Sequence, residues 1–316
     1  MNQSKEVVYV IGHKNPDTDS VVAALGYTDY LQQRGSLPGV EIAPARAGEL
    51  NNETVYALSY FKTTSPPLLE NAAGCKLILV DHAEKSQMVD GAEKSEILGV
   101  LDHHRATLNH QNPIFFHTEA VGSTSTLVAE KYFRDEHLGV RLSPRMAGLL
   151  LAGILSDTVV FRSSTTTAKD KELAKKLATV AGVFDLERLG TSLKKAGVVV
   201  AGGLEDLVTS DFKDWELFGK KIGVSQIETA DLLPILAKRG ELKDVLSKIY
   251  CRGDYYLAVL MLTDIIKIGT QIIAVGNTRE LCQAFNNGII TDEFYVAGMI
   301  SRKKDFIPLL TKALAP

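Results

Sequence analysis

A histidine and two aspartates stand close together near the start of the chain, in the stretch IGHKNPDTDSVVAAL. His13, Asp17 and Asp19 follow the apolar run VVYVIG and precede a run with helical spacing. Carboxylates supply hard oxygen ligands that can bridge two cations, and imidazole adds a nitrogen ligand suited to manganese, cobalt, iron or zinc. These residue types at this spacing indicate part of a site for divalent cations.

Further residues of the same types follow later apolar segments. Asp81 comes after KLILV, the triplet DHH comes after ILGVL, and Asp157 follows a long apolar run. If the first two runs are parallel strands, their carboxyl ends lie at one edge of a sheet, where ligands of open α/β sheets bind. The candidates that we expect at this edge are His13, Asp17, Asp19, Asp81, Asp102, His103, His104 and Asp157.

Each candidate alone has an ordinary structural explanation. Asp19 or Ser20 can cap the helix that follows, a lone buried histidine usually belongs to a core, and Asp81 can lie in a turn after a strand. Their joint occurrence at successive strand and helix ends is hard to assign to caps and turns, so it favours a site for two metal ions. Asp17 and Asp19, two residues apart in a loop, could serve different ions.

The elements that must position these residues follow from hydrophobic periodicity. Up to residue 189, apolar β-rich runs alternate with helical patterns, which predicts an α/β domain with a parallel, doubly wound sheet. The strands are predicted over 7–12, 40–46, 76–82 and 97–104. The helices are predicted over 20–35, 53–61, 123–135, 143–158 and 168–182.

The pattern changes near residue 190. Residues 190–203 are rich in Gly and Lys and are interpreted as a linker or hinge. Residues 204–316 are interpreted as a second, smaller α/β domain. Its predicted elements are a hairpin over 215–229 that turns at Gly219-Lys220, a helix over 231–250, and strands over 255–266, 270–276 and 293–301.

Composition excludes several classes of protein. The chain has 316 residues and a net charge of −3, too near neutral to favour a nucleic-acid or membrane surface. The apolar run at 146–155 is too short to span a bilayer, and the N-terminus shows no signal-peptide pattern. Cys75, Cys251 and Cys282 form no CxxC pair. We therefore expect a cytoplasmic protein with no membrane or nucleic-acid partner.

The motifs HKNPDTDS, VDH, DHH and SDT occur in that order, and SRKKD follows at 301–305. This set resembles the family II (manganese-dependent) inorganic pyrophosphatases of the DHH phosphoesterase superfamily, over both domains. The resemblance implies hydrolysis of pyrophosphate to two orthophosphates by a metal-bridged hydroxide (EC 3.6.1.1). It also implies a DHH catalytic domain at 1–189, a DHHA2-like domain at 204–316, and an active site in the cleft between them.

The resemblance further implies the cofactors and partners. Two Mn²⁺ ions per subunit are expected, Co²⁺ or Mg²⁺ may substitute for them, and a further Mg²⁺ arrives with the substrate. The expected assembly is a homodimer formed through the N-terminal domain.

Residue roles carry over from the resemblance position by position. The first ion would bind His13, Asp17, Asp81 and Asp157, and the second would bind Asp19, Asp81, His103 and Asp157. Asp81 and Asp157 would therefore bridge the ions. The residues that would contact the substrate are His104, Lys213, Arg302 and Lys303. Asp102 would support the histidine segment from behind the ligands.

Two other interpretations stay open at this point. A DHH-type phosphoesterase could act on short polyphosphate or oligonucleotides, but AGGLEDL at 201–207 lacks the histidine of the glycine-rich motif that the nucleotide-directed relatives usually carry. A non-catalytic module that binds metal or phosphate is the second alternative, and a full ligand set accompanied by basic residues argues against it.

Overall fold

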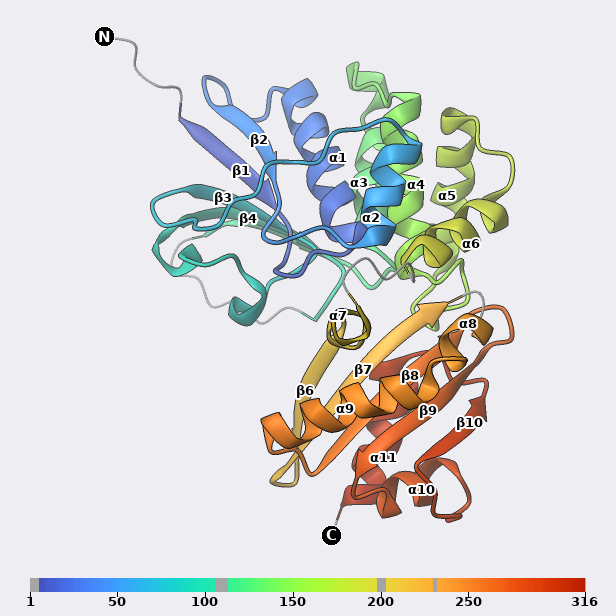
Figure 1. Ribbon diagram of the computed structural model, residues 1–316. Helices are drawn as coiled ribbons and strands as arrows, with labels where there is room; N and C mark the ends of the chain where they lie inside the picture. The colour runs from blue at the N-terminus through green and yellow to red at the C-terminus, as the bar shows by residue number, and fades with distance from the viewer. Residues whose placement is uncertain (1–5, 106–112, 198–202, 230–231, 316) are drawn as a thin grey trace. The chain divides into compact units, whose positions relative to one another are not determined.

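The chain divides into two compact units in the computed structural model, Met1–Leu193 and Lys194–Pro316. The structure describes residues 6–105, 113–197, 203–229 and 232–315, and each unit is described by itself (Figure 1). The division falls within the predicted linker at 190–203. Residues 190–197 of that linker belong to helix α6 (Leu186–Gly197), and residues 198–202 lie outside the described residues.

The first unit contains a five-stranded sheet with the order β2-β1-β3-β4-β5. Every neighbouring pair is parallel, which confirms the predicted parallel sheet. The bounds are β1 (Val7–Ile11), β2 (Glu41–Ala45), β3 (Lys76–Val80), β4 (Glu96–Asp102) and β5 (Phe115–Thr118). The edge strand β5 was not predicted, because its FFHT sequence is short and lacks apolar–polar alternation.

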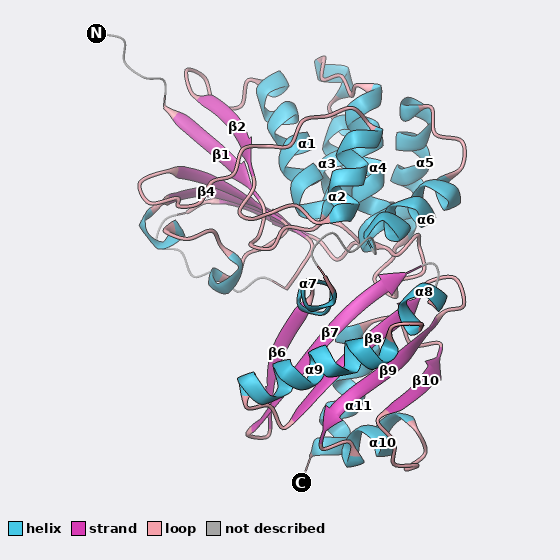
Figure 2. Cartoon of the chain, in the orientation of Figure 1, coloured by secondary structure: helices cyan, strands magenta, loops and turns pink. Residues whose placement is uncertain are grey.

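Both faces of this sheet are covered, by different kinds of structure. The helices stand side by side on one face (Figures 1 and 2), with α1 packed on β1, β2 and α4. The other face carries Ile11, Leu77 and Leu79, which pack against Met88 and Val89. That cover contains two short 3₁₀ turns, Lys85–Gln87 and Ala92–Lys94. The helices are α1 (Thr18–Arg34), α2 (Asn52–Tyr60), α3 (Thr124–Arg134), α4 (Pro144–Asp157), α5 (Ala168–Ala181) and α6.

Helix α1 begins two residues earlier than the sequence pattern indicated. Asp17 is its N-cap, and the Asp17 side chain accepts a hydrogen bond from the Ser20 amide at 2.9 Å. Asp19 and Ser20 therefore lie within the helix, and the expectation that one of them caps it is wrong. The predicted end is confirmed, because Gly35 adopts the left-handed conformation (φ 59°) that commonly terminates helices.

The second unit contains a smaller five-stranded sheet with the order β10-β9-β8-β7-β6. Its strands are β6 (Phe212–Leu217), β7 (Lys220–Thr229), β8 (Leu257–Asp264), β9 (Gly269–Gly276) and β10 (Glu293–Ala297). Only β7 and β8 pair in parallel among these. The predicted hairpin is confirmed, although its turn lies at Phe218-Gly219, one residue earlier than expected, where both φ angles are positive.

Helices cover both faces of this second sheet. One face carries α7 (Leu204–Thr209), α8 (Leu233–Leu236) and α9 (Arg239–Gly253), whose apolar side chains join one core cluster. The opposite face carries α10 (Arg279–Phe285) and α11 (Ile307–Leu314). A π-helical turn, η4 (Arg302–Phe306), immediately precedes α11. The predicted helix over 231–250 is thus two helices, and residues 230–231 lie outside the described residues.

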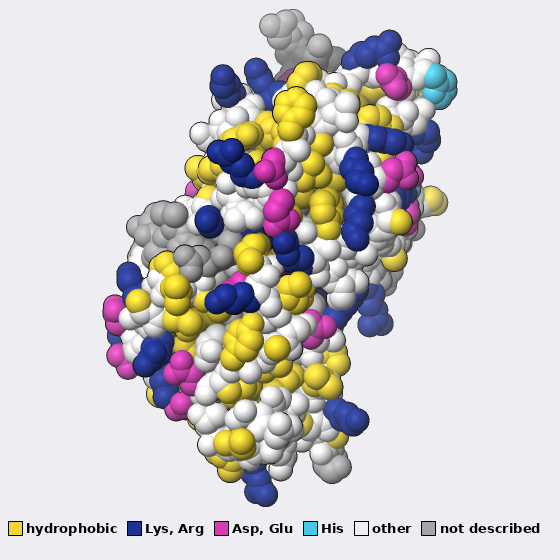
Figure 3. All heavy atoms as spheres, turned by 90° about the vertical axis from the view of Figure 1, so that its right-hand side faces the viewer, with side chains coloured by type: hydrophobic (Ala, Val, Ile, Leu, Met, Phe, Trp, Pro, Cys, Tyr) yellow, Lys and Arg dark blue, Asp and Glu magenta, His cyan; other side chains and the backbone are white. Residues whose placement is uncertain are grey.

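The surface drawn in Figure 3 carries interspersed acidic and basic side chains, as the near-neutral net charge indicates. Within the described part of the chain, no helix combines the length and the apolar character needed to cross a bilayer.

Candidate metal centre

The loop between β1 and α1 contributes the first group of candidate ligands. His13 Nε2 lies 3.4 Å from Asp17 Oδ2 and 3.3 Å from Asp81 Oδ2. Asp81 follows the end of β3, which is the strand next to β1. One ligand atom from each of these three residues lies within 4.8 Å of the other two, so the group can surround a single cation.

A second group of ligands lies beside the first. It combines Asp19, Asp81, His103 and Asp157, whose ligand atoms also lie within 4.8 Å of one another. His103 Nε2 is 3.3 Å from both Asp81 Oδ1 and Asp157 Oδ2. Asp81 belongs to both groups and presents a different oxygen to each histidine, as a carboxylate that bridges two ions would.

Asp157 falls in the second group, with Asp19, Asp81 and His103. The resemblance implies that it also binds the first ion, and that role stays a prediction. Asp157 is the last residue of α4, so its carboxylate approaches the centre from the helical layer. This arrangement leaves Asp81 as the shared carboxylate of the two groups.

Hydrogen bonds fix the orientation of both imidazoles. His13 Nδ1 lies 2.7 Å from the Lys14 carbonyl oxygen, and His103 Nδ1 lies 3.0 Å from the Val121 carbonyl oxygen. A carbonyl can only accept, so each Nδ1 carries the proton and donates it. Each Nε2 then faces the carboxylates and presents a lone pair to a metal ion once the imidazole has lost its second proton, which is the usual arrangement of metal-bound histidine.

The backbone is strained at the shared ligand. Asp81 has a positive φ of 65°, and Asn15, in the loop between His13 and Asp17, has a φ of 52°. Non-glycine residues in this conformation each cost of order 1 kcal/mol, and such residues cluster at functional sites. The strain at Asp81 turns the chain abruptly at the end of β3 and is consistent with a functional position.

The N-terminus of α3 holds two of the carboxylates, a feature that the sequence analysis missed. The Thr124 and Ser125 amides donate to the two Asp19 oxygens at 2.6 and 2.9 Å. The Thr124 hydroxyl donates to Asp81 Oδ1 at 3.0 Å. The available signal is the run GSTST at the start of the helix, a pattern that also indicates an ordinary helix N-terminus.

Gly153 on α4 allows this close packing. A Cβ atom at this position would lie 2.3 Å from Ser125 Oγ and 2.9 Å from Asp19 Oδ1. Any side chain would therefore push α4 away from the buried Asp19 carboxylate.

The two histidines hold protons more tightly than usual. Burial lowers the pKa of His13, but Asp17 and Asp81 outweigh burial and raise it well above the usual value. Burial likewise lowers the pKa of His103, and Asp157 and Asp81 raise it further than burial lowers it. The protein without metal thus keeps positive charge on the imidazoles that face its carboxylates.

The pKa values of the carboxylates are shifted in opposite directions. Burial and the charge of Asp17 raise the pKa of Asp157 to about 6, and burial with neighbouring Asp157 raises the pKa of Asp19 well above its usual value. Burial also acts on Asp81, but His103 and His13 keep its pKa well below the usual value. So much negative charge in a buried place indicates that a cation belongs there.

The arrangement fits divalent ions. Asp81 Oδ2 and His103 Nε2 are buried without a hydrogen-bond partner among the described residues. Asp81 Oδ2 lies 3.3 Å from His13 Nε2, and His103 Nε2 lies 3.3 Å from Asp81 Oδ1, which is long for a hydrogen bond. Two ligands bound at about 2.1 Å and at right angles to one octahedral ion lie about 3 Å apart, close to these distances. Oxygen-rich sets with one imidazole each suit manganese, cobalt and magnesium.

Asp102 holds the second histidine of the DHH triplet. Its Oδ1 accepts from the His104 amide at 3.1 Å and from His104 Nδ1 at 3.0 Å, and also from the His103 amide at 2.8 Å. His104 is partly exposed, unlike the buried His103 ring. This geometry leaves His104 Nε2 available to a ligand other than Asp102.

The basic candidates lie in the second unit. Lys213 is half-exposed on β6, and Arg302 and Lys303 lie in the turn η4. Lys213 and Arg302 contact the same carboxylate, Asp211. Arg302 is buried, although a terminal SRKK run usually lies in solvent, and Lys303 is exposed.

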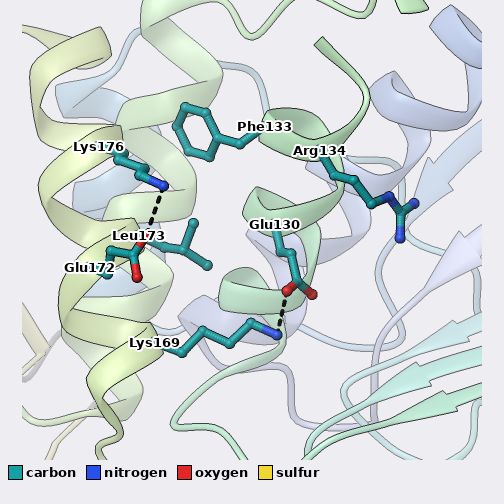
Figure 4. Close-up of a pocket in the computed structure, with 7 residues that line it drawn as sticks. All are labelled: Glu130, Phe133, Arg134, Lys169, Glu172, Leu173 and Lys176. Atoms are coloured by element: carbon teal, nitrogen blue, oxygen red, sulfur yellow. Dashed lines mark ion pairs between the residues drawn. The ribbon is translucent and has the colours of Figure 1, made fainter. Parts of the chain in front are cut away.

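A separate surface pocket of about 300 Å³ lies between α3 and α5 (Figure 4). Its lysines are already paired, Lys169 with Glu130 and Lys176 with Glu172. It contains none of the candidate ligands, so we do not assign the site there.

Comparison with known proteins adds independent findings. Residues 7–154 match the DHH family, N-terminal domain, and residues 191–313 match the DHHA2 domain. The chain is 40% identical over 312 residues to the manganese-dependent inorganic pyrophosphatase of Methanocaldococcus jannaschii, covering 96% of this chain and 98% of that protein. It is 36% identical over 315 residues to the manganese-dependent inorganic pyrophosphatase of Bacillus subtilis, covering 98% and 99%.

A solved structure shares the whole architecture. It is described as a family II inorganic pyrophosphatase of Methanococcus jannaschii, and it superposes with a TM-score of 0.82 at 39% identity. The match covers 97% of this chain and 99% of that chain.

Proposed function

The chain belongs to the DHH family, among the family II, manganese-dependent inorganic pyrophosphatases, and we propose that it hydrolyses pyrophosphate to two orthophosphates. It is thus an inorganic diphosphatase (EC 3.6.1.1). The observation that carries this proposal is the pair of ligand groups that share Asp81. In-line attack of water on a phosphorus atom needs a site of this kind, because two cations can stabilise both the attacking and the leaving oxygen.

The metals are assigned to residues of the first unit. His13, Asp17 and Asp81 would hold one Mn²⁺, and the group of Asp19, Asp81, His103 and Asp157 would hold the other. When bound, these ions supply Lewis acidity and lower the pKa of bound water. We also propose that Co²⁺ or Mg²⁺ can replace Mn²⁺, and that a further Mg²⁺ enters with the substrate.

The remaining polar residues act on the substrate. Asp102 orients His104, which directs its Nε2 toward an oxygen of pyrophosphate. Lys213, Arg302 and Lys303 bind phosphate oxygens, because ammonium and guanidinium groups compensate the charge of a transferring phosphoryl group. In this proposal residues of both units act on one pyrophosphate molecule.

A substrate panel tests the proposed function. The metal-free protein, refilled with Mn²⁺, Co²⁺ or Mg²⁺, is expected to release orthophosphate from pyrophosphate much faster than from tripolyphosphate or a dinucleotide. Preferential cleavage of tripolyphosphate or the dinucleotide would instead identify a DHH-type phosphoesterase. Phosphate release at the background rate with every metal would favour a non-catalytic binding module.

Lys213→Ala is expected to weaken substrate binding and spare the metals. Loss of one charge-assisted hydrogen bond, worth about 1.5–3 kcal/mol, should raise KM about tenfold or more. Manganese content should stay unchanged, because no ligand is altered. Lys213 is preferable to Arg302 for this test, because Arg302→Ala would also empty a buried site and destabilise the second unit.

The matched control for this test is Lys221→Ala, on the neighbouring strand β7. Lys221 is also half-exposed, but its ammonium donates to the Gly253 carbonyl and lies over the Tyr255 ring. An equal rise of KM in both variants would show that general loss of positive charge, and not Lys213 itself, is responsible.

The assembly and location are also proposed. We propose a homodimer formed through the first unit and a cytoplasmic location. Sedimentation equilibrium of the full chain checks the dimer, and a monomer at micromolar concentration would contradict it.

A further inference from the structure

Two of the proposed phosphate-binding cations meet at one carboxylate in the second unit. Asp211 Oδ1 lies 2.8 Å from Arg302 Nη2 and 3.5 Å from Lys213 Nζ. Asp211 immediately precedes β6, and Lys213 lies two residues further along this strand. Residues two apart in an extended chain project to the same side, so Lys213 lies beside the carboxylate that also binds Arg302.

Arg302 contacts two backbone carbonyl groups and an aromatic ring. Arg302 Nη1 donates to the Asp211 carbonyl oxygen at 2.5 Å and to the Val224 carbonyl oxygen at 3.2 Å. The guanidinium also lies 5.4 Å from the centre of the Trp215 ring. Asp211 thus holds Arg302 with both its backbone oxygen and its side chain.

Burial makes this carboxylate necessary. Arg302 is 5% exposed, and a buried charge is tolerated only where it is paired and hydrogen-bonded. The two carbonyl groups satisfy donors but carry no net charge. The Asp211 carboxylate is the only anionic group that contacts the Arg302 guanidinium among the described residues.

The Nε donor of Arg302 is unused among the described residues. Its Nε is buried and has no hydrogen-bond partner within the described parts of the chain. A guanidinium that is fixed on its Nη side keeps one orientation, which preorganises its remaining donors for an oxygen acceptor such as a phosphate oxygen. Lys213, half-exposed and at a longer distance from Asp211, keeps the freedom to turn toward the same acceptor.

We propose that Asp211 is a positioning residue for pyrophosphate binding, which holds Arg302 in place and keeps Lys213 beside it. This inference rests on the proposed function, because it assigns no new substrate. Asp211 does not contact the substrate; it acts through the two cations.

Loss of the Asp211 carboxylate affects pyrophosphate binding in two opposing ways. Removing the carboxylate lessens its repulsion of pyrophosphate, but this carboxylate is 43% exposed, and water and salt weaken such an interaction. Removing it also takes away the one anionic partner that the guanidinium has among the described residues, which costs a charge-assisted hydrogen bond. The second contribution is larger, so loss of Asp211 weakens substrate binding.

The test measures Asp211→Asn in the full chain with pyrophosphate, Mg²⁺ and saturating Mn²⁺. Asn keeps the volume and one acceptor, so the fold is retained, but it cannot compensate the charge. KM is expected to rise about tenfold or more, while kcat changes less than about threefold and manganese content is unchanged. Asp211→Glu should recover part of the affinity.

The matched control is Asp214→Asn on β6, the strand that Asp211 immediately precedes. Asp214 accepts from the Tyr255 hydroxyl at 2.7 Å and lies 4.0 Å from Lys221, away from Arg302. This variant removes the same charge and should leave KM unchanged. An equal KM in the two Asn variants, or a lower KM in Asp211→Asn, would overturn the proposal.

A double-mutant cycle separates positioning from a purely structural role. If Asp211 acts through Arg302, then Asp211→Asn should add little to the KM of Arg302→Lys. Effects on KM that multiply independently, or a loss of thermal stability with KM unmoved, would refute the assignment. Failure of the proposed function looks different, because the wild-type chain would then not hydrolyse pyrophosphate at all.

Discussion

Asp81→Asn is expected to abolish binding of both metal ions and to lower kcat/KM by at least about a thousandfold. The factor follows from the several kcal/mol of transition-state stabilisation that bound metal ions supply. Asp81 is a member of both ligand groups, and the amide that replaces its second oxygen is a donor that cannot bind a cation. Elemental analysis of the dialysed protein measures the ions per chain, and phosphate release measures the rate.

Asp157→Asn is the second variant, to be compared with Asp81→Asn. Asp157 belongs to the second group alone, so this variant should lose one ion and keep the other. If Asp157 bridges the ions, as the resemblance implied, both ions should be lost, as in Asp81→Asn. Glu172→Gln is the control, because Glu172 is exposed on α5 and pairs with Lys176. Two ions retained in Asp81→Asn would refute the assignment of the centre.

Manganese affinity is expected to rise steeply between pH 6 and pH 7.5. In the metal-free protein, neighbouring carboxylates keep the pKa values of His13 and His103 well above their usual value despite burial. Burial and Asp17 raise the pKa of Asp157 to about 6. A metal ion must displace these protons, and each displaced proton changes the affinity about tenfold per pH unit.

Calorimetric titration in buffers of different ionisation enthalpy measures both the affinity and the protons released. Release of one to two protons, with the dissociation constant falling about 30-fold to 1000-fold over this range, is the expected result. His137→Gln is the control, because His137 is an exposed histidine outside the ligand groups. Binding without proton release would contradict the prediction.

The stability of the metal-free protein offers a second measurement of the same protons. Above pH 6.5, and until the pH reaches their raised pKa values, folded His13 and His103 keep protons that the unfolded chain has lost. The folded state then binds more protons, so stability falls as pH rises, by up to about 1.4 kcal/mol per pH unit for each histidine. The low pKa values of Asp81 and Asp17 act only near pH 4 and below. Excess Mn²⁺ should remove this decline.

The sequence indicated which candidate ligands the structure brings together, because strand ends are easily recognised. Buried runs of β-branched residues predicted β1, β3 and β4, and the parallel arrangement then brought His13, Asp81 and His103 to one edge. The assignment of Asp157 to one group could not be predicted, because it depends on where the last turn of α4 lies against α1. Gly153 allows that close packing because it has no side chain, and the sequence does not show which residues approach it.

Other features lacked a local signal. Thr124 acts through hydrogen bonds to residues 43 positions and more away, which no sequence periodicity reveals. The burial of Arg302 depends on Asp211, 91 positions distant. Helices α7 and α10 are short, so too few residues repeat on one face to give a helical pattern. Element type was predictable for most of the long periodic runs, with α6 as an exception because the Gly and Lys content of residues 190–203 was interpreted as a linker. Side-chain partnerships were not predictable.

The ligands of the centre come from segments spread between residues 13 and 157. During synthesis, the centre is incomplete until α4 has left the ribosome and packed beside α1. An ion held by the second group can therefore bind only after most of the first unit has been synthesised, unlike the zinc of small fingers, whose ligands lie close together and which are unfolded without metal.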